Sequence, residues 1–471
     1  MEMKTFSRRR VRRGVLLTAV VATALPLGAQ PATGVQATSP ETTQMQGVFP
    51  DGQEWQISVP DNWNGVVIND LDAVPRLASG SPIAEYFLEN GYAYTGTRRH
   101  PDRSFNWDPP AESNNMAAVL DIFSDEFGEP ATAIQYGCSG GGSVGLSVAE
   151  DHPDIFDGVI SMHASDPITL ANMRLDLSVA LKGLLDEDDV LPLIIDDGEQ
   201  AEASEIWTSV LAEAAQSDQG RARMALALVM AQYPIWGSGP KPDFADNEAV
   251  QQSVVDAAAI AAVRAVTGRP MWDQPAGLMS WNEGVDYRRF YNHADPSHQE
   301  IVRDLYADAG LSPARAIPAD LERINAQPRI SATSSGVEYF RSRMRTGDVK
   351  IPMLHASTIG DASTPPSVMA RDAAAVTANG ASSLYRQAFI EAPGHCTHNV
   401  AEVAALLDTL EERIETGTWG DTKPGALNQS AAESGQGIGR FVPSAFATGW
   451  KLPTTLNRAF LPGTTWPGDA S

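Results

Sequence analysis

A glycine-rich turn with a serine at its centre is the feature that most constrains how this 471-residue chain can fold. The run GCSGGG at residues 137–142 follows a strand-like stretch and precedes a helix-compatible stretch, 143–152. A serine placed between a strand and a helix in the pattern Gly-x-Ser-x-Gly is typical of a nucleophile elbow, where small neighbours let backbones pack closely. The hydroxyl of Ser139 would then stand at the carboxyl end of a sheet, beside a helix N-terminus that favours an oxyanion. An ordinary glycine-rich turn between a strand and a helix is the alternative.

The elbow lies in a part of the chain where short apolar runs alternate with helix-like stretches. The strand-like runs lie at 55–59, 65–69, 92–97, 131–136 and 158–162, and the helix-like stretches at 82–90 and 116–127. Short apolar strands that alternate with helices indicate a doubly wound, mostly parallel sheet. Residues 38–50 are polar, and we expect them to be a loose lead-in.

The alternation stops near residue 166, and a helix-rich segment follows. Strand-like runs return at 350–355 and 384–390, followed by a helix-like stretch at 401–416. An elbow inside such a sheet predicts the α/β-hydrolase fold, interrupted by an inserted helical lid. The expected parts are a core at 38–165 and 347–420, a lid at 166–346, and an irregular C-terminal extension at 421–471.

The first residues have the pattern of an export signal. Five arginines lie among residues 8–13, and an apolar stretch at 14–27 follows that is too short to span a bilayer. The run RRGVLL at 12–17 is similar to a twin-arginine signal, and Ala37 ends a plausible cleavage site. We therefore expect residues 1–37 to be removed and the protein to be secreted, without stable membrane association afterwards. A retained membrane anchor is the alternative.

The charge of the chain narrows the classes of partner. The formal net charge is −25 at pH 7, and removing the basic signal would make it more negative. Such an excess argues against binding to nucleic acid or to anionic membrane surfaces. A solubilising exterior is the simpler interpretation, and attraction of cationic substrates is the alternative.

A serine hydroxyl needs a general base within hydrogen-bond reach, and the base needs an acid that orients it. In this architecture the chain order is serine, acid, histidine. His395 fits as the base because it follows the last strand-like run, and His398 is its main competitor. Asp361 fits as the acid because it follows the run at 350–355. Asp166 is the next candidate, and a solvated turn aspartate is the other interpretation of Asp361.

The two cysteines of the chain lie beside these candidates. Cys138 precedes Ser139, and Cys396 follows His395. A disulfide between them would tie the nucleophile to the base, and export makes a disulfide credible because cytosolic thiols stay reduced. Two unpaired buried cysteines are the alternative. Because Cys396 lies next to His395, we favour His395 over His398 as the base.

The oxyanion hole should use two backbone N–H groups. The first belongs to Gly140, the residue after the nucleophile. The second should come from the loop after the strand at 65–69, around Asp70 and Leu71. This loop lacks the His-Gly or Gly-Gly sequence that is usual there.

The pairs Cys138-Ser139 and His395-Cys396, with Asp361 between them, resemble the CS-D-HC arrangement of the tannase and feruloyl esterase family. The resemblance covers roughly residues 131–163 and 351–400. It implies a Ser-His-Asp triad, a disulfide between the two cysteines, and carboxylic esters as substrates, including esters of phenolic acids. Family members commonly carry further disulfides and a calcium loop in the lid, but this chain has no further cysteine.

The acidic run at 186–189 lacks the spacing of a calcium loop and is interpreted as a solvated helix end. We expect neither a metal nor a cofactor. The sequence predicts a secreted serine esterase that works through an acyl-enzyme. The alternatives are a polyester or polyhydroxyalkanoate depolymerase, an acyltransferase or peptidase with the same triad, and a non-catalytic secreted binding protein. The identity of the ester and the oligomeric state are left open by the sequence.

Overall fold

The computed structural model describes residues 41–102, 108–196, 198–273 and 277–444, so the predicted export signal lies outside the described residues. Their centre is a nine-stranded sheet with the order β1-β2-β4-β3-β5-β6-β7-β8-β9. The six central strands, β4, β3, β5, β6, β7 and β8 in sheet order, run parallel. Strands β1 and β2 at one edge and β9 at the other pair antiparallel. The strands are β1 (Thr42–Val48), β2 (Glu54–Pro60), β3 (Val66–Asp70), β4 (Ala93–Thr97), β5 (Thr132–Cys138), β6 (Gly158–Met162), β7 (Met353–Gly360), β8 (Tyr385–Pro393) and β9 (Phe441–Val442).

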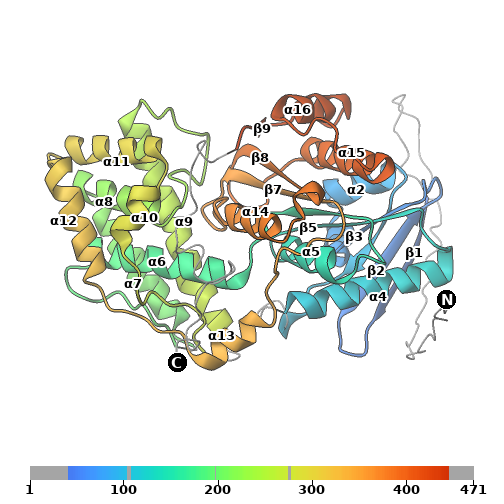
Figure 1. Ribbon diagram of the computed structural model, residues 1–471, viewed down its shortest axis with the longest axis horizontal. Coiled ribbons are helices and arrows are strands. Elements are labelled where there is room, and N and C mark those ends of the chain that lie inside the picture. The colour runs from blue at the N-terminus through green and yellow to red at the C-terminus, as the bar shows by residue number, and fades with distance from the viewer. Residues whose placement is uncertain (1–40, 103–107, 197, 274–276, 445–471) are drawn as a thin grey trace, which may run out of the picture.

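Helices cover both faces of this sheet, as a doubly wound arrangement requires (Figure 1). On one face, α2 (Pro82–Glu89), α15 (Val400–Thr416) and α16 (Pro424–Glu433) share an apolar cluster with alternate strand residues. On the other face, α4 (Pro109–Phe127), α5 (Gly140–Asp151) and α14 (Val368–Ala378) pack on the remaining strand residues. Both faces of the central strands are buried, which is why these strands read as continuous apolar runs in the sequence. The expected α/β-hydrolase fold with a mostly parallel sheet is confirmed.

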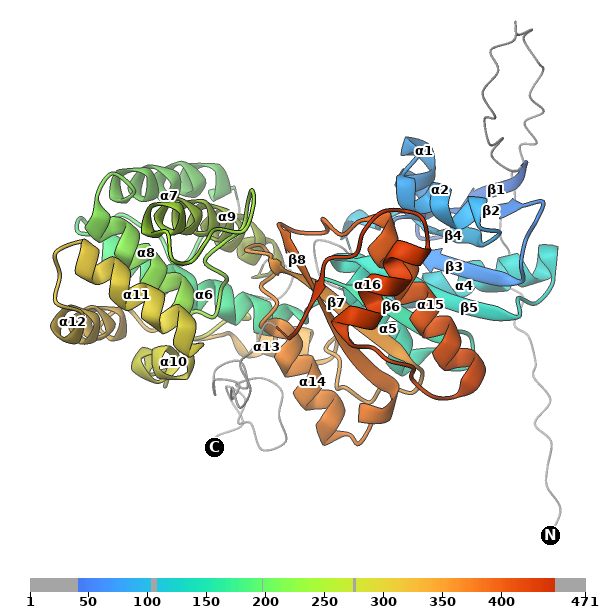
Figure 2. The same cartoon turned by 90° about the horizontal axis from the view of Figure 1, so that it is seen from above.

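The segment between β6 and β7 is helical throughout its described regular elements, and α6 to α12 form a group beside one end of the sheet (Figures 1 and 2). This group has its own apolar core, which includes most of the buried side chains of α6. The helices are α6 (Pro167–Leu185), α7 (Gln200–Ala214), α8 (Asp218–Met230), α9 (Asn247–Asp273), α10 (Tyr287–His293), α11 (Pro296–Asp308), α12 (Pro313–Asn325) and α13 (Ser334–Arg341). We call α6 to α13 the lid.

Helix α9 is long and apolar enough, by length and composition, to cross a membrane over Asn247–Val266. A buried core helix of a soluble protein meets the same criterion, so length and composition alone do not identify a membrane span. Val250, Val254 and Ala261 of this helix are buried in the apolar core of the lid. Within the described residues no other helix meets the criterion.

Two expectations at the ends of the core were wrong. Residues 42–48, expected as a loose lead-in, form strand β1, which pairs along its whole length with β2. Its side chains are mostly polar and exposed, so an apolar pattern could not reveal it. The extension expected to be irregular contains helix α16, whose Leu427 and Ala431 are buried, and strand β9. Residues 445–471 of that extension lie outside the described residues.

Candidate active site

Ser139 lies in a strained turn between β5 and α5. Its backbone angles are φ 61° and ψ −120°, a conformation that side-chain-bearing residues rarely adopt. The turn packs too closely for larger neighbours. A Cβ on Gly137 would lie 2.5 Å from the carbonyl carbon of Gly141, and a Cβ on Gly142 would lie 2.3 Å from the carbonyl oxygen of Met162. The glycines around the serine therefore have the steric role that the sequence indicated.

A disulfide joins Cys138, the last residue of β5, to Cys396 in the loop after β8. The two Cα atoms are 6.1 Å apart, although 258 positions separate them in the sequence. The bond therefore holds the residue before Ser139 against the residue after His395. The described residues contain no free cysteine.

Asp361 and His395 are joined by a short hydrogen bond. The Nδ1 atom of His395 lies 2.6 Å from Oδ2 of Asp361, and the carboxylate is fully buried. The other carboxylate oxygen accepts backbone N–H groups from Ser363 at 2.8 Å and Thr364 at 2.9 Å. Burial alone would raise the pKa of Asp361, but His395 and the hydrogen bonds from His163 and His395 hold that pKa well below its ordinary value. The carboxylate therefore stays ionised, which favours the tautomer of His395 that carries its proton on Nδ1.

A second histidine shares the same carboxylate oxygen, and sequence reasoning missed it. His163 lies directly after β6, is buried, and has its Nδ1 atom 2.8 Å from Oδ2 of Asp361. Its backbone has φ 51°, so the turn that carries it is strained. Burial lowers the pKa of His163 despite the hydrogen bond to Asp361, so the ring is neutral. The available signal was its position after a central strand, since the carboxyl ends of parallel strands meet at one edge of the sheet.

The competitor His398 is placed differently. It is buried, and its Nε2 atom lies 2.9 Å from the hydroxyl of Tyr136. Its pKa is held well below the ordinary value by burial and by the neighbouring His163. Among the described residues it makes no hydrogen bond to Asp361, so the acid contacts His395 and not His398.

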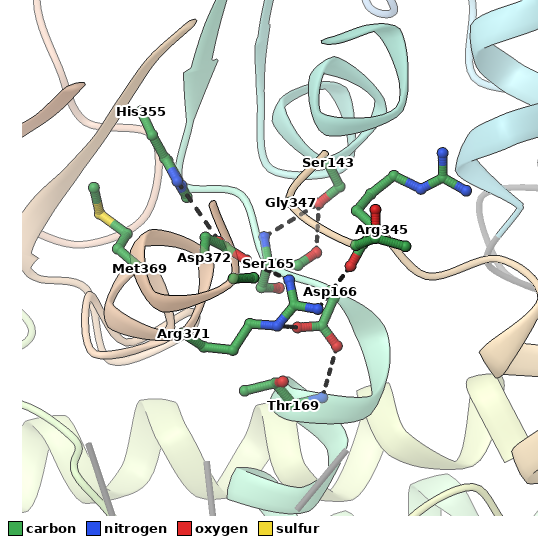
Figure 3. Close-up of polar contacts among 12 residues, drawn as sticks. Ser143, Ser165, Asp166, Thr169, Arg345, Gly347, His355, Met369, Arg371 and Asp372 are labelled. Atoms are coloured by element: carbon green, nitrogen blue, oxygen red, sulfur yellow. Dashed lines mark hydrogen bonds and ion pairs between the residues drawn. The ribbon is translucent and has the colours of Figure 1, made fainter. Parts of the chain in front are cut away.

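The alternative acid, Asp166, belongs to a separate buried network (Figure 3). Its carboxylate caps helix α6 by accepting the N–H of Thr169 at 2.9 Å, and it lies 3.5 Å from Nε of Arg371. Arg371 also pairs with Asp372 at 2.7 Å. This network joins the first turn of the lid to helix α14 of the core. Asp166 therefore holds the lid to the core and makes no contact with His395.

The loop expected to supply the second oxyanion donor lies next to the elbow. The Cβ atom of Leu71 is 3.5 Å from the position that a Cβ on Gly141 would occupy. Asp70 stabilises this loop, because its buried carboxylate accepts the N–H of Asp72 at 2.9 Å and pairs with Arg76 at 2.9 Å. Gly140 begins helix α5, and the N–H of a first helical residue has no acceptor within its own helix.

Among the described residues, Ser139 makes no hydrogen bond to His395. Catalytic hydrogen bonds are often long in unliganded enzymes and tighten only when substrate is bound. The disulfide nevertheless joins the residue before Ser139 to the residue after His395, and the bond to Asp361 orients the His395 ring.

Two clusters contain side chains of metal-binding types. Cys138, His163 and His398 form one, and His163, Asp361 and His395 form the other. In the first cluster the sulfur is bound in the disulfide and offers no thiolate. In the second, the Nδ1 atoms of both histidines already contact Oδ2 of Asp361, at 2.8 Å and 2.6 Å. Neither donor set therefore fits a resident ion in this state of the protein.

The acidic run of the lid is not simply a solvated helix end, as we had expected. The side chain of Asp186 is covered, pairs with Lys182 at 2.8 Å, and accepts the N–H groups of Val190 and Leu191. Asp189 is exposed and also contacts Lys182. The carboxylate of Asp186 thus stabilises the loop after α6.

Comparison with known proteins places the chain in a family. No protein-family model matches the chain. The chain is 35% identical over 449 residues to o-phthalyl amidase of Xanthobacter agilis, which covers 89% of this chain and 97% of that protein. The chain belongs to the o-phthalyl amidase family. The expectation of a hydrolase that acts on carboxylic esters is confirmed at the level of a hydrolase of ester or amide bonds.

Solved structures with the names of the expected family are also similar to the chain. Feruloyl esterase B from Aspergillus oryzae covers 81% of this chain and 82% of its own at 14% identity, with a TM-score of 0.36. Tannin acyl hydrolase from Aspergillus niger covers 80% of this chain and 79% of its own at 12% identity, with a TM-score of 0.38. Likeness at this level carries no argument about activity. For the o-phthalyl amidase family member described here, the fold assignment stands on its own strand order and elbow.

Proposed function

We propose that this member of the o-phthalyl amidase family is a secreted serine hydrolase with Ser139, His395 and Asp361 as its triad. The observation that supports the proposal most is the 2.6 Å bond between Asp361 and His395, on a loop that is covalently tied to the residue before Ser139. The strained backbone of Ser139 at a strand-to-helix turn supports the role of nucleophile.

In the proposed reaction, Ser139 Oγ attacks the carbonyl carbon while Nε2 of His395 accepts its proton. The N–H of Gly140, with that of Leu71 as the second donor, stabilises the oxyanion. His395 then protonates the departing alcohol or amine as its bond to the acyl carbon breaks. Water, deprotonated by His395, attacks the acyl-enzyme and releases the acid and the free serine. The buried carboxylate of Asp361 stabilises the imidazolium in both halves of the reaction.

The substrates that we propose are amides and esters of aromatic carboxylic acids. The relative in Xanthobacter agilis is named an o-phthalyl amidase, and a phthalyl group is an aromatic acyl group with a carboxyl function on the neighbouring ring carbon. The sequence resemblance pointed to esters of aromatic acids, and an acyl-enzyme can form from either bond type. The family membership adds amides to the esters that the sequence resemblance indicated.

We also propose that the protein works outside the cytosol. The disulfide supports this location, because cytosolic thiols are kept reduced. The export signal that would direct it, residues 1–37, lies outside the described residues. A protein without this signal after processing would have no stable association with a membrane.

The proposed nucleophile is tested with a fluorophosphonate probe and a panel of substrates. We expect Ser139→Ala to abolish both labelling and the hydrolysis of benzoate, gallate, ferulate and short aliphatic esters and of benzanilides. Ser147→Ala is the matched control, because this serine lies two turns further along α5, is buried, and has no hydrogen-bond partner for its hydroxyl. Labelling of the Ser139→Ala protein would overturn the assignment.

Polyester films in the same panel test the depolymerase alternative, and added alcohols or amines test acyl transfer. Turnover of soluble substrates with water as the acceptor is the result that we expect. Labelled protein that turns over none of the panel would contradict the proposed substrate class while leaving the nucleophile in place.

A further inference from the structure

An arginine is held beside the nucleophile elbow, on the loop after β4. Arg99 donates from Nε and Nη2 to the two carboxylate oxygens of Asp72, each at 2.7 Å. Its Nη2 atom also lies 3.3 Å from the carbonyl oxygen of Cys138, the residue before Ser139. A guanidinium held by a bidentate pair is fixed in orientation as well as in position.

The remaining nitrogen of Arg99 points to the elbow. Nη1 is 2.8 Å from the position that a Cβ on Gly140 would occupy, so the absence of a side chain there allows this approach. Among the described residues Nη1 makes no hydrogen bond, whereas Nε and Nη2 do. The arginine side chain is 36% exposed, so a ligand can reach it. Burial would lower the pKa of Arg99, but the hydrogen bonds that it donates to Asp72 raise that pKa above its ordinary value, and the group stays charged.

The other arginines near this edge of the sheet are paired with carboxylates. Arg76 pairs with the buried carboxylate of Asp70. Arg98, the residue before Arg99, pairs with Glu54 on strand β2. The whole chain carries a net charge of −25, so an anionic ligand would otherwise be repelled. A cation within contact distance of the proposed oxyanion residue Gly140 is therefore a specific feature of this edge of the sheet.

We propose that Arg99 is the specificity-determining residue that binds a carboxylate on the acyl group of the substrate. The inference rests on the proposed function, since it places the scissile carbonyl at Gly140. The carboxylate in question is the one on the neighbouring ring carbon of a phthalyl group, the acyl group in the name of the relative from Xanthobacter agilis, and the inference concerns the residue that binds it. With the scissile carbonyl at Gly140, a carboxylate on the neighbouring carbon would be close enough to reach Nη1, which lies 2.8 Å from the position of a Cβ on Gly140. A carboxylate on the opposite side of an aromatic ring is directed away.

The kinetic test uses three 4-nitroanilides: that of benzoic acid and those carrying an ortho or a para carboxylate. We expect the native enzyme to prefer the ortho compound in kcat/KM. Arg99→Gln should reduce that preference by about 10- to 100-fold, the range for a hydrogen bond between charged groups. Arg98→Gln is the matched control and should keep the preference, because Arg98 makes its ion pair on the strand and not at the elbow. Arg99→Lys should restore part of it.

Binding provides a readout that does not need turnover. Phthalate should bind to the Ser139→Ala protein more tightly than benzoate in calorimetry, and Arg99→Gln should remove the difference. Equal loss of kcat/KM on all three anilides would overturn the inference, since Arg99 would then act on the oxyanion or on the fold. Equal affinity for phthalate and benzoate would overturn it as well. Absence of labelling and of turnover would refute the proposed function alone, because the binding comparison still decides the role of Arg99.

Discussion

Reduction of the disulfide should inactivate the enzyme before it unfolds it. The bond closes a loop of 258 positions, and the chain-entropy model assigns such a loop about 5 kcal/mol of stabilisation as an upper figure. The His395 loop also has restraints of its own. The N–H of Gly394 donates to Gly360 at 2.9 Å, and the hydroxyl of Thr358 donates to the carbonyl of Gly394 at 2.6 Å. The loop should therefore stay near the sheet after reduction while its tip, at His395 and Cys396, gains freedom.

The expected loss follows from the geometry of the proton transfer. A displacement of about 1 Å between catalytic groups can cost about 100-fold in rate, so we expect kcat to fall by about 10- to 100-fold in the reduced protein. Because Cys138 is buried, thiols must be counted during the assay to show that the bond has opened. Activity, thiol number and far-ultraviolet circular dichroism are followed together. The double variant Cys138→Ala/Cys396→Ala should reproduce the effect without reductant. Unchanged turnover with both thiols free and the fold intact would refute this reasoning.

Two further predictions concern the buried acid and the histidine that shares it. Because the pKa of Asp361 is lower in the folded protein than its ordinary value, its ionised form stabilises the fold above about pH 4, and this contribution is lost as pH falls toward the folded pKa. Asp361→Asn should therefore flatten the acid side of the stability profile in urea titrations and lower kcat by about 1,000- to 10,000-fold; an unchanged acid limb would contradict it. His163→Phe should lower kcat and move the acid limb of the kcat/KM profile to higher pH, because the carboxylate then acts on one imidazole in place of two. His163→Asn, which retains an N–H donor, should shift that limb less, whereas equal profiles for both variants would assign His163 a purely structural role.

The central strands could be predicted from the sequence because both of their faces are buried. The run expected at 158–162 is β6, and that expected at 131–136 overlaps β5. The elbow could be predicted because close packing around Ser139 demands glycine at fixed positions. The disulfide could be predicted because the chain has only two cysteines and both lie beside candidate catalytic residues. In each case one physical requirement leaves few residue types possible.

Features that depend on pairing between distant segments could not be predicted. Strand β1 consists mostly of exposed polar residues and is defined by its backbone bonds to β2, which leave no apolar pattern. The contact of His163 with Asp361 joins residues 198 positions apart and requires that β6 and β7 be neighbours in the sheet. Arg99 has the same difficulty, because its loop meets the elbow only through the order of β3, β4 and β5.

The shared carboxylate explains how a fully buried acid can serve this site. Asp361 receives two backbone N–H groups on one oxygen and two imidazole N–H groups on the other. A buried carboxylate without such partners would take up a proton and could no longer orient His395. With these four contacts it stays ionised, and its charge is shared between the imidazoles of His163 and His395. His163 is neutral, so it fixes the carboxylate without adding a positive charge that would oppose the imidazolium formed on His395. The arrangement therefore holds the carboxylate of Asp361 between two imidazoles, and the pH profiles of the His163 variants measure whether His163 affects the reaction or only the fold.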